Sequence, residues 1–543
     1  SQMGSAQEIA LRLTPLKEVY YTHDTTFDFN PKGHRETNYV LLGIAFLILF
    51  IAGINFTNLT TSLIPLRLKT INTHRVLGCS IYKLQAISLI ESIVICLISY
   101  ILALFIVNDL SYTPIANWVD ADIRLSQYKG LILLTALIAI LTGCLAGLYP
   151  AIRSTSYAPA LVLKGSFGLS PKGKKVRVAL IGFQYTVSIA LIIVTLFMGL
   201  QNHFMTSSEQ LGFNKDQVAI VNLTPEIYAK HKPQYIQKLK DYPGIEDVAF
   251  SVYELSKEDD MIDLEYARHE DKDVFFKVFY ASENFLSVMD IQVEEGRDFT
   301  REDLNKAQSD YIINPAAERD FHLHPGDRFN DRTVLGVSKD FRFNSCRIAS
   351  SPFVFALNND IPNPKLVSYI RFNSKTNLQE AVAHVRETLK EIDPTFPFEI
   401  SFYNTILNNL YQKEQTLGKL ISLFGIMAIL ISIVGVFGLV LFETQYRRKE
   451  IGIRKINGAT TGQILLMFNK TYIRIVSVCF IISIPIAWMG TQQWLENFAY
   501  KTPLHLWVFI VAFLIILSVT IGTVTFRNWQ AANENPVNSV KSE

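Results

Sequence analysis

The chain has 543 residues, of which 49% are hydrophobic and only 18% are charged. Soluble domains carry about 25% charged residues on average, so this composition excludes an ordinary soluble globular protein. The formal net charge of +2 hides an uneven distribution, because residues 201–415 hold 35 of the 49 acidic residues and 24 of the 51 basic ones. The rest of the chain is basic, and this asymmetry excludes a nucleic-acid-binding protein with an evenly basic surface.

Seven stretches are apolar enough to cross a bilayer, since a membrane-spanning helix needs about 20 mostly apolar residues. They are predicted at Tyr39–Leu63, Ile81–Val107, Leu131–Tyr149, Val178–Leu200, Leu417–Phe442, Ile473–Met489 and Leu504–Val524. The composition therefore predicts an α-helical integral membrane protein whose first partner is the lipid bilayer.

The short loops between these stretches predict the orientation, because Lys and Arg are retained on the cytoplasmic side. The loops after the first, third and fifth spans are rich in Lys and Arg, whereas the alternate connections are not. All the basic loops fall on one side of the membrane when seven spans are drawn. The N-terminus and residues 201–415 are then predicted outside the cell membrane, and the C-terminus in the cytoplasm.

Residues 201–415 are predicted to form an α+β domain. Gln217–Leu223 alternates like a strand, and Leu378–Ile392 has apolar residues at helical spacing before an Asp-Pro stop. Gln201–Leu211 and Ile406–Leu420 are predicted to continue the flanking spans as stalk helices. Such unbroken helices would transmit displacement, whereas a flexible Gly/Ser linker would absorb it.

The membrane part contains an internal repeat. Arg67–Ser80 (RLKTINTHRVLGCS) matches Arg447–Thr460 (RRKEIGIRKINGAT) at an offset of 380 residues. A second match aligns Pro159 and Lys164 with Pro536 and Lys541. The repeat predicts two three-helix units plus one connecting span. The predicted domains are 1–36 (the end of an outer domain), 37–176 (first unit), 177–200 (connecting span), 201–415 (outer domain) and 416–543 (second unit).

The repeated motif resembles the FtsX-like permease domain of MacB-type ABC transporters, the mechanotransmission class, in the style of Bacteroidetes sequences. SSEQLGFNKDQVAIVNL and EEGRDFTREDLNKAQSDYIINPAAERDF are similar to that family's periplasmic core domain. Against the family pattern, the chain is expected to lack its first membrane helix and most of a first periplasmic domain. The resemblance implies a non-catalytic permease of the bacterial inner membrane, working as a homodimer or heterodimer with ABC ATPase subunits at the cytoplasmic face. A periplasmic adaptor is a further candidate partner.

The resemblance also implies a role for each copy of the motif, as a coupling segment that binds the ATPase. In the second copy the residues are Lys449, Glu450, Ile451, Gly452, Arg454, Lys455, Gly458 and Ala459. The first copy is degenerate and retains Arg67, Lys69, His74, Arg75 and Gly78. There, Thr70 replaces the Glu, Asn72 the Gly and Cys79 the Ala. The alternative interpretation is that these basic residues only set the membrane topology.

Other candidate sites are weaker. Glu91 lies in the second predicted span, where an ionisable residue is either functional or held by an interhelical bond. The acidic run Lys257–Asp273 lacks the spacing of a calcium loop, and His322 and His324 have no third ligand nearby in the sequence. No phosphate-binding loop of the form G-x-x-x-x-G-K-[ST] occurs, so no cofactor is predicted for the chain itself and ATP is expected on the partner subunit.

Three functions remain open at this stage. The first is a permease that drives export of an antimicrobial peptide, a drug or another amphiphile, with lipoprotein release as its variant. The second is a membrane receptor with an external ligand-binding domain, although the longest predicted cytoplasmic segment leaves no room for an output domain. The third is a membrane-embedded enzyme, which is disfavoured because His, Asp and Glu are nearly missing from the predicted spans.

Overall fold

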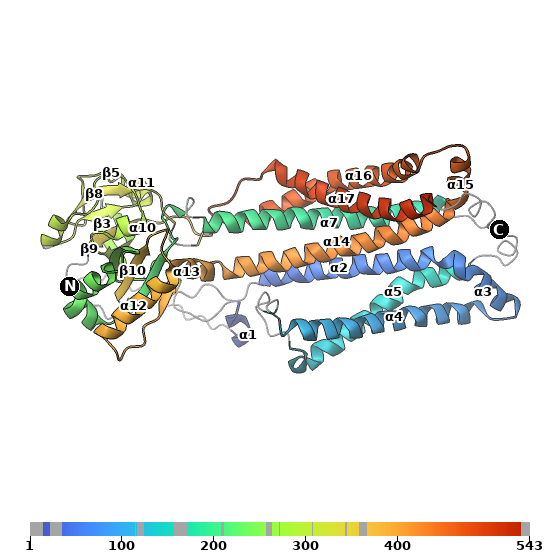
Figure 1. Cartoon of the computed structure of the whole chain (residues 1–543), viewed down its shortest axis with the longest axis horizontal. Coiled ribbons are helices and arrows are strands. Elements are labelled where there is room, and N and C mark those ends of the chain that lie inside the picture. Colours follow the sequence, from blue (N-terminus) through green and yellow to red (C-terminus); the bar gives the residue numbers. More distant parts are fainter. Residues whose placement is uncertain are drawn as a thin grey trace. The chain divides into compact units, whose positions relative to one another are not determined.

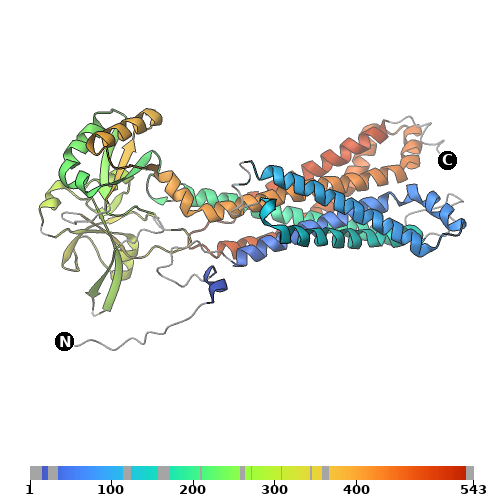
Figure 2. The same cartoon turned by 90° about the horizontal axis from the view of Figure 1, so that it is seen from below.

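The computed structural model describes residues 15–21, 35–113, 116, 124–156, 171–207, 211–256, 263–270, 272–306, 308–342, 345–357 and 366–533. The chain divides into two units, drawn in Figures 1 and 2. A helical unit comprises Ser1–Leu196, Gly418–Met489 and His505–Glu543, and a sheet unit comprises Phe197–Leu417 and Gly490–Leu504. Most of the predicted segment 1–36 lies outside the described residues, as do Pro159, Lys164, Pro536 and Lys541.

Seven long apolar helices lie among the described residues, which confirms the predicted spans. They are α2 (Arg35–Ser62), α4 (Ile81–Leu110), α5 (Lys129–Thr155), α7 (Pro171–Thr206), α14 (Gln412–Tyr446), α16 (Thr461–Leu495) and α17 (Leu506–Ala532). Most extend past the predicted ends, because polar flanking residues continue the helix beyond the apolar stretch. Shorter elements are α1 (Leu16–Val19), α3 (Ile64–Val76), η2 (Leu125–Gln127) and α15 (Arg448–Ile456).

The predicted repeat is confirmed in the backbone. Helices α5 and α17 each have 27 residues, and both their first and their last residues are 377 positions apart. Helices α3 and α15 end at Val76 and Ile456, which are 380 positions apart. Each repeat is therefore a long helix, a short helix and two further long helices, and α7 is the extra helix that connects the first repeat to the sheet unit.

Small residues allow the helices of the first repeat to pack closely. Gly143 and Gly147 of α5 face α4, where a Cβ on Gly147 would overlap the side chain of Ser92 and a Cβ on Gly143 would lie 3.0 Å from the Cα of Ile93. Lipid offers no hydrophobic driving force between helices, so such close backbone approach is a main source of helix–helix attraction. Gly143 and Gly147 are four residues apart, so both lie on the face of α5 that packs against α4.

The sheet unit is built on one mixed sheet with the strand order β11-β1-β10-β2-β4-β9-β6-β8-β5, to which β3 and β7 add at β4 and β8. The strands are β1 (Val218–Leu223), β2 (Ile245–Ser251), β3 (Asp263–His269), β4 (Lys272–Ala281), β5 (Val293–Gly296), β6 (Tyr311–Ile313), β7 (Arg328–Phe329), β8 (Arg332–Ser338), β9 (Phe353–Leu357), β10 (Leu366–Phe372) and β11 (Ile400–Phe402). The pairs β4–β9 and β6–β8 are parallel and the other pairs antiparallel.

The sheet is covered by short helices. They are η3 (Ile227–His231), α9 (Lys232–Lys240), α10 (Phe285–Met289), η4 (Arg301–Asn305), α11 (Pro315–Phe321), α12 (Leu378–Ile392) and α13 (Tyr403–Leu410). Helices α9 and α12 bury Tyr235, Leu239, Val385 and Leu389 against β1, β2 and β10, while α10 and α13 contribute to a separate core. The predicted strand at Gln217–Leu223 and the predicted helix at Leu378–Ile392 are both confirmed.

The prediction of one unbroken stalk helix over Ile406–Leu420 is wrong, because the helix is interrupted at Tyr411. Tyr411 separates α13 from α14 with φ −106° and ψ 13°, outside the helical region. Its ring is fully buried, and its hydroxyl accepts a hydrogen bond from the backbone N–H of Cys346 (3.2 Å). This tertiary contact outweighs the helical propensity of the local sequence. The other predicted stalk, Gln201–Leu211, is described as helix only to Thr206, and residues 208–210 lie outside the described part.

The close packing of α4 on α5 makes a stability prediction. Gly147→Ala inserts a methyl group where Ser92 already lies, so it should lower the free energy of unfolding by about 1–3 kcal/mol. Gly130→Ala on the same helix is the matched control, because a Cβ there meets nothing within 4 Å. Thermal unfolding of the detergent-purified variants measures both. Equal unfolding temperatures for the two variants would contradict the packing.

Candidate functional site

The second motif copy forms α15 and the turn that follows it. The helix ends at a left-handed glycine, Gly458, with φ 88°. The N–H of Ala459 donates to the carbonyl of Arg454 (3.0 Å), and the N–H of Gly458 donates to the carbonyl of Lys455 (3.0 Å). These bonds close the helix end, so the glycine of the motif is required by backbone geometry rather than by ligand binding.

The faces of α15 differ in exposure. Ile451 and Gly452 are buried against the bundle, whereas Ile453 and Ile456 are exposed, Ile456 by 64%. Arg454 forms an ion pair with Glu450 one turn earlier (Nη2 to Oε1, 2.7 Å). Exposed apolar residues beside half-exposed charges are what a protein partner can bind. The side chain of Lys449 lies outside the described residues.

The first motif copy, α3, has the same backbone. Gly78 has φ 93°, and the N–H of Cys79 donates to the carbonyl of His74 (2.9 Å), at positions equivalent to the bond in α15. Asn72, which replaces the motif's first glycine, Gly452, is buried and donates from Nδ2 to the carbonyl of Leu68 (2.9 Å). The predicted degeneracy therefore changes side chains and leaves the fold of the segment intact. The side chain of Lys69 lies outside the described residues.

Two of the basic residues predicted for α3 bind other helices of the helical unit. Arg67 forms a two-pronged ion pair with Glu91 of α4 (2.7 and 2.8 Å), and Arg75 donates to the carbonyl of Thr155 at the end of α5 (3.1 Å). Of the two interpretations of Glu91, the structure shows the interhelical bond. The ion pair holds α3 on α4, the helix that follows it.

The second repeat holds α15 with a different carboxylate. Arg447, which precedes α15 and is equivalent to Arg67, forms an ion pair with Glu443 of α14 (3.0 Å). Glu443 also accepts a hydrogen bond from the hydroxyl of Tyr472 on α16 (3.2 Å). Sequence reasoning missed Glu443 because it was assigned to no span and lies outside the repeated motif. The recurrence of Arg67 as Arg447 was the signal in the sequence that a carboxylate partner should be sought near Arg447 as well.

The sheet unit contains a cluster of four buried residues, which we call the hub: Met205, Cys346, Tyr411 and Phe498. They come from α7, the loop after β8, the break before α14, and the connection between α16 and α17. Gln201 of α7 is fully buried and uses both ends of its amide, accepting from the N–H of Thr502 (2.8 Å) and donating to the carbonyl of Tyr500 (3.0 Å).

Charged contacts surround the hub. Arg347 donates from Nε to Glu414 at the start of α14 (2.7 Å), and its guanidinium lies 4.9 Å from the ring centroid of Phe498. Arg342 lies 4.1 Å from the ring centroid of Tyr500. Because Glu414 is buried, removing either partner of its ion pair would leave an uncompensated charge. The hub thus packs together four stretches of the sheet unit that are far apart in the sequence.

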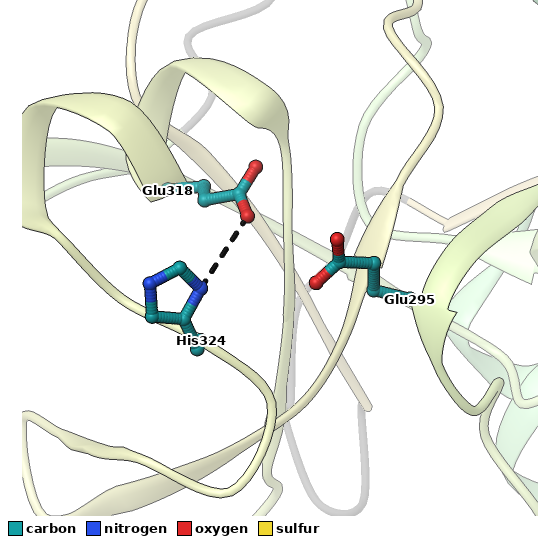
Figure 3. Close-up of side chains that lie close together, drawn as sticks. All are labelled: Glu295, Glu318 and His324. Atoms are coloured by element: carbon teal, nitrogen blue, oxygen red, sulfur yellow. Dashed lines mark ion pairs between the residues drawn. The ribbon is translucent and has the colours of Figure 1, made fainter.

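One group of possible metal ligands lies on the sheet unit (Figure 3). Glu295 of β5, Glu318 of α11 and His324 offer ligand atoms that all lie within 4.8 Å of one another, and His324 Nδ1 lies 3.6 Å from Glu318. His322, the other histidine of the sequence pair, is the left-handed residue that ends α11. The three side chains are accessible to water, and two of them, His324 and Glu318, contact each other directly.

The Arg67–Glu91 ion pair makes a testable prediction. Both side chains are nearly half exposed, so Glu91→Gln should lower the free energy of unfolding by less than about 1 kcal/mol. Exchanging the charges in Arg67→Glu/Glu91→Arg should restore most of that loss. A double-mutant cycle of thermal unfolding measures the coupling. A double variant no more stable than the sum of its singles would contradict the pairing.

The hub makes a second prediction through its thiol. Burial raises the pKa of Cys346, so little of the reactive thiolate exists at neutral pH. Gln201→Leu removes both amide bonds and leaves two buried backbone groups without partners, which should open the hub and speed alkylation of Cys346 at least tenfold. Cys79, which is more accessible, is the internal control. Unchanged labelling of Cys346, measured by mass spectrometry of the peptide, would show that Gln201 does not hold the hub closed.

Comparison with known proteins places both repeats in one family. The model of the FtsX-like permease C-terminal domain matches residues 42–159 and again 422–536. Two curated relatives are named "Macrolide export ATP-binding/permease protein MacB". The one from Aggregatibacter actinomycetemcomitans is 25% identical over 212 residues, 37% of this chain and 32% of that protein. The one from Neisseria gonorrhoeae is 25% identical over 223 residues, 38% of this chain and 34% of that protein. The matched part thus spans about a third of these relatives' length.

Solved structures align with part of the chain. The periplasmic region of MacB from Actinobacillus actinomycetemcomitans is 15% identical, with 37% of this chain and 94% of that one covered and a TM-score of 0.27. The extracellular domain of the transporter YknZ from Gram-positive bacteria is 15% identical, with 34% and 99% covered and a TM-score of 0.26. The doubled family match coincides with the two three-helix repeats that the structure shows. Both repeats thus resemble the FtsX-like permease domain, and the curated relatives of the chain are permeases of the MacB type.

Proposed function

We propose that the chain is the membrane subunit of an ABC transporter that receives movement from a separate ATPase subunit and passes it to the sheet unit. The proposal rests on the exposed surface of α15 and on the ion pair that attaches this helix to α14. Helix α15 presents Ile453 and Ile456 to solvent beside Arg454, while Arg447 anchors it to α14 through Glu443. A surface that binds a partner while fixed to a spanning helix is what coupling requires.

Helix α14 supports this role because it carries both anchoring carboxylates. Glu443, near its last residue, binds the arginine that precedes α15, and Glu414, near its first residue, binds Arg347 of the sheet unit. The helix is continuous from Gln412 to Tyr446, so hydrogen bonds along its axis resist extension. A push on α15 is thereby delivered to a helix that also holds the hub.

The orientation follows from the basic residues that flank the spans. Both α3 and α15 belong at the cytoplasmic face of the bacterial inner membrane, the C-terminus in the cytoplasm, and the sheet unit in the periplasm. The relatives' name contains macrolide export, and on that support the cargo is an antimicrobial peptide, a drug or another amphiphile. The ATP is bound and hydrolysed by the partner, so the coupling residues of this chain hold no nucleotide.

Charge reversal in α15 tests the coupling. The double substitution Arg454→Glu/Lys455→Glu places two negative charges on the docking face and should weaken copurification of the ATPase subunit at least tenfold, which corresponds to about 1.4 kcal/mol. Quantitative mass spectrometry of the complex from native membranes measures the ratio of ATPase to permease. Arg319→Glu, an exposed arginine of the sheet unit, is the matched control and should leave that ratio unchanged. An unaltered ratio in the α15 variant would contradict docking at α15.

A further inference from the structure

One face of helix α16 points away from the rest of the helical unit. The buried side chains of this helix recur every three or four residues, at Tyr472, Val476, Cys479 and Ser483. Exposed side chains recur at the same spacing on the opposite face, at Lys470, Arg474, Val478 and Ile481. Residues three and four apart share a face of a helix, and α16 is long and apolar enough to span the membrane. The second set therefore faces the lipid.

Two positive charges lie on this lipid-facing surface. Lys470 and Arg474, which we call the cationic pair, are one helical turn apart. Neither side chain has a hydrogen bond or an ion pair with any residue that the structure describes. Charged side chains in membrane helices almost always face the interior of the bundle or pair with a group of opposite charge. A partner for the cationic pair is therefore to be sought outside the described residues.

Tryptophans on the neighbouring helix α17 mark where the membrane surfaces lie. Trp507 and Trp529 are 48% and 55% exposed and stand 22 residues apart. That separation is about 33 Å along a helix, close to the hydrocarbon thickness of about 30 Å. Exposed tryptophans gather at membrane interfaces, so these two delimit the span. The end of α17 lies beside the start of α16, because Thr461 Oγ1 donates to Asn533 Oδ1 (3.5 Å).

The cationic pair lies inside the interface that Trp529 marks. Asn469, next to Lys470, donates from Nδ2 to Oγ1 of Thr525 (2.9 Å), one turn before Trp529. Lys470 is thus about one turn inside the interface and Arg474 about two. Helical side chains lean toward the N-terminus of their helix, which for α16 is the end beside Trp529. The ammonium and guanidinium groups therefore reach back toward the lipid headgroups.

The first repeat shows that the fold does not need these charges. Helices α4 and α16 begin 380 residues apart, at Ile81 and Thr461. At that offset the cationic pair corresponds to Ile90 and Val94 of α4, which are both exposed and apolar. The same lipid-facing positions are therefore filled by aliphatic side chains in one repeat and by cations in the other. A requirement of helix packing would apply to both repeats.

A third residue of this surface differs in the opposite sense. Thr471 of α16 corresponds to Glu91 of α4, the carboxylate that binds Arg67. Thr471 is exposed, and α16 contains no Asp or Glu at all, so the helix offers the cationic pair no acid of its own. The threonine hydroxyl adds a third hydrogen-bond donor beside the ammonium and guanidinium groups. Three such donors, two of them charged, match the acceptor oxygens of a phosphate.

We propose that Lys470, Thr471 and Arg474 bind the phosphate of an anionic phospholipid in the leaflet on the α15 side of the membrane. Charge complementarity selects an anion, and the lipid-facing position selects an anion that the bilayer itself supplies. The acyl chains of the bound lipid lie along Val478 and Ile481, the exposed apolar residues one and two turns deeper on the same face. The site gives the second repeat a lipid contact that the first lacks, whatever the cargo of the transporter.

Native mass spectrometry of the full chain tests the site. The chain is delipidated in detergent and titrated with dioleoylphosphatidylglycerol, and the dissociation constant of the first bound lipid is measured. Lys470→Ile/Arg474→Val copies the residues of the first repeat and should weaken that binding about tenfold or more. Lys83→Ile/Lys129→Val removes two exposed lysines from the starts of α4 and α5 and should leave it unchanged. The proposal is overturned if the first variant binds as tightly as the parent chain, or if both variants lose affinity equally.

A second substitution keeps both cations and so guards against a folding defect. Thr471→Glu supplies the carboxylate that Glu91 supplies in the first repeat, so it should pair with the cations and weaken binding by a similar factor. Dioleoylphosphatidylcholine, which carries no net charge, should bind the parent chain about tenfold more weakly than the anionic lipid. Unchanged binding in Thr471→Glu, or equal affinity for the two lipids, would contradict recognition by charge.

Two further probes separate a lipid from other occupants of this face. Inorganic phosphate at millimolar concentration should not displace dioleoylphosphatidylglycerol, because it cannot replace the contacts of the acyl chains. A photo-crosslinking amino acid at Val478 should give lipid adducts in native membranes. Displacement by phosphate would show a site for the free anion, and an adduct with another protein or with a second copy of this chain would assign the face to that partner. Either result would overturn the proposal.

Discussion

Close approach of α14 to its neighbours is the constraint on which the helical unit depends. Gly435 allows α2 to approach α14 closely. A Cβ added to Gly425 would lie 3.3 Å from Oγ1 of Thr195 on α7. The hydroxyls of Ser432 and Ser188 of α7 form a hydrogen bond with each other (2.9 Å). Inside a bilayer there is little hydrophobic drive between helices, so small residues and buried polar bonds determine which helices pack together. A larger side chain at any of these positions would separate the repeats from each other or from the connecting helix.

The ion pairs Arg67–Glu91 and Arg447–Glu443 attach α3 and α15 to this packed bundle. The proposed coupling requires that α3 and α15 each have a fixed position on the helix bundle. Each repeat achieves this with an arginine and a glutamate, but the glutamate comes from the following helix in one repeat and from the preceding helix in the other. The arginine recurs in both repeats, whereas the position of its glutamate does not. The two segments therefore share a position and differ in what they leave free for a partner.

Hydropathy and repeat spacing predicted most of the membrane architecture, because both depend on local sequence. The seven spans follow from the length of apolar stretches, and the equivalence of α3 with α15 follows from one glycine and its neighbours at a constant offset. The break at Tyr411 was not predictable, since it is stabilised by Cys346, 65 residues away. The partner of Glu91 and the role of Glu443 were hidden for the same reason: both depend on which helices pack together.

Distances between the coupling segments test the central claim most directly. Spin labels at Val76→Cys and Ile456→Cys, equivalent exposed positions of α3 and α15, report how the two segments move in the complex with its ATPase. Pulsed electron paramagnetic resonance would compare the nucleotide-free complex with one trapped by ATP and vanadate. The account predicts that the distance shortens on trapping, because closing ATPase subunits draw both segments together. The same distance in both states would contradict a permease that works by relaying the movement of its ATPase.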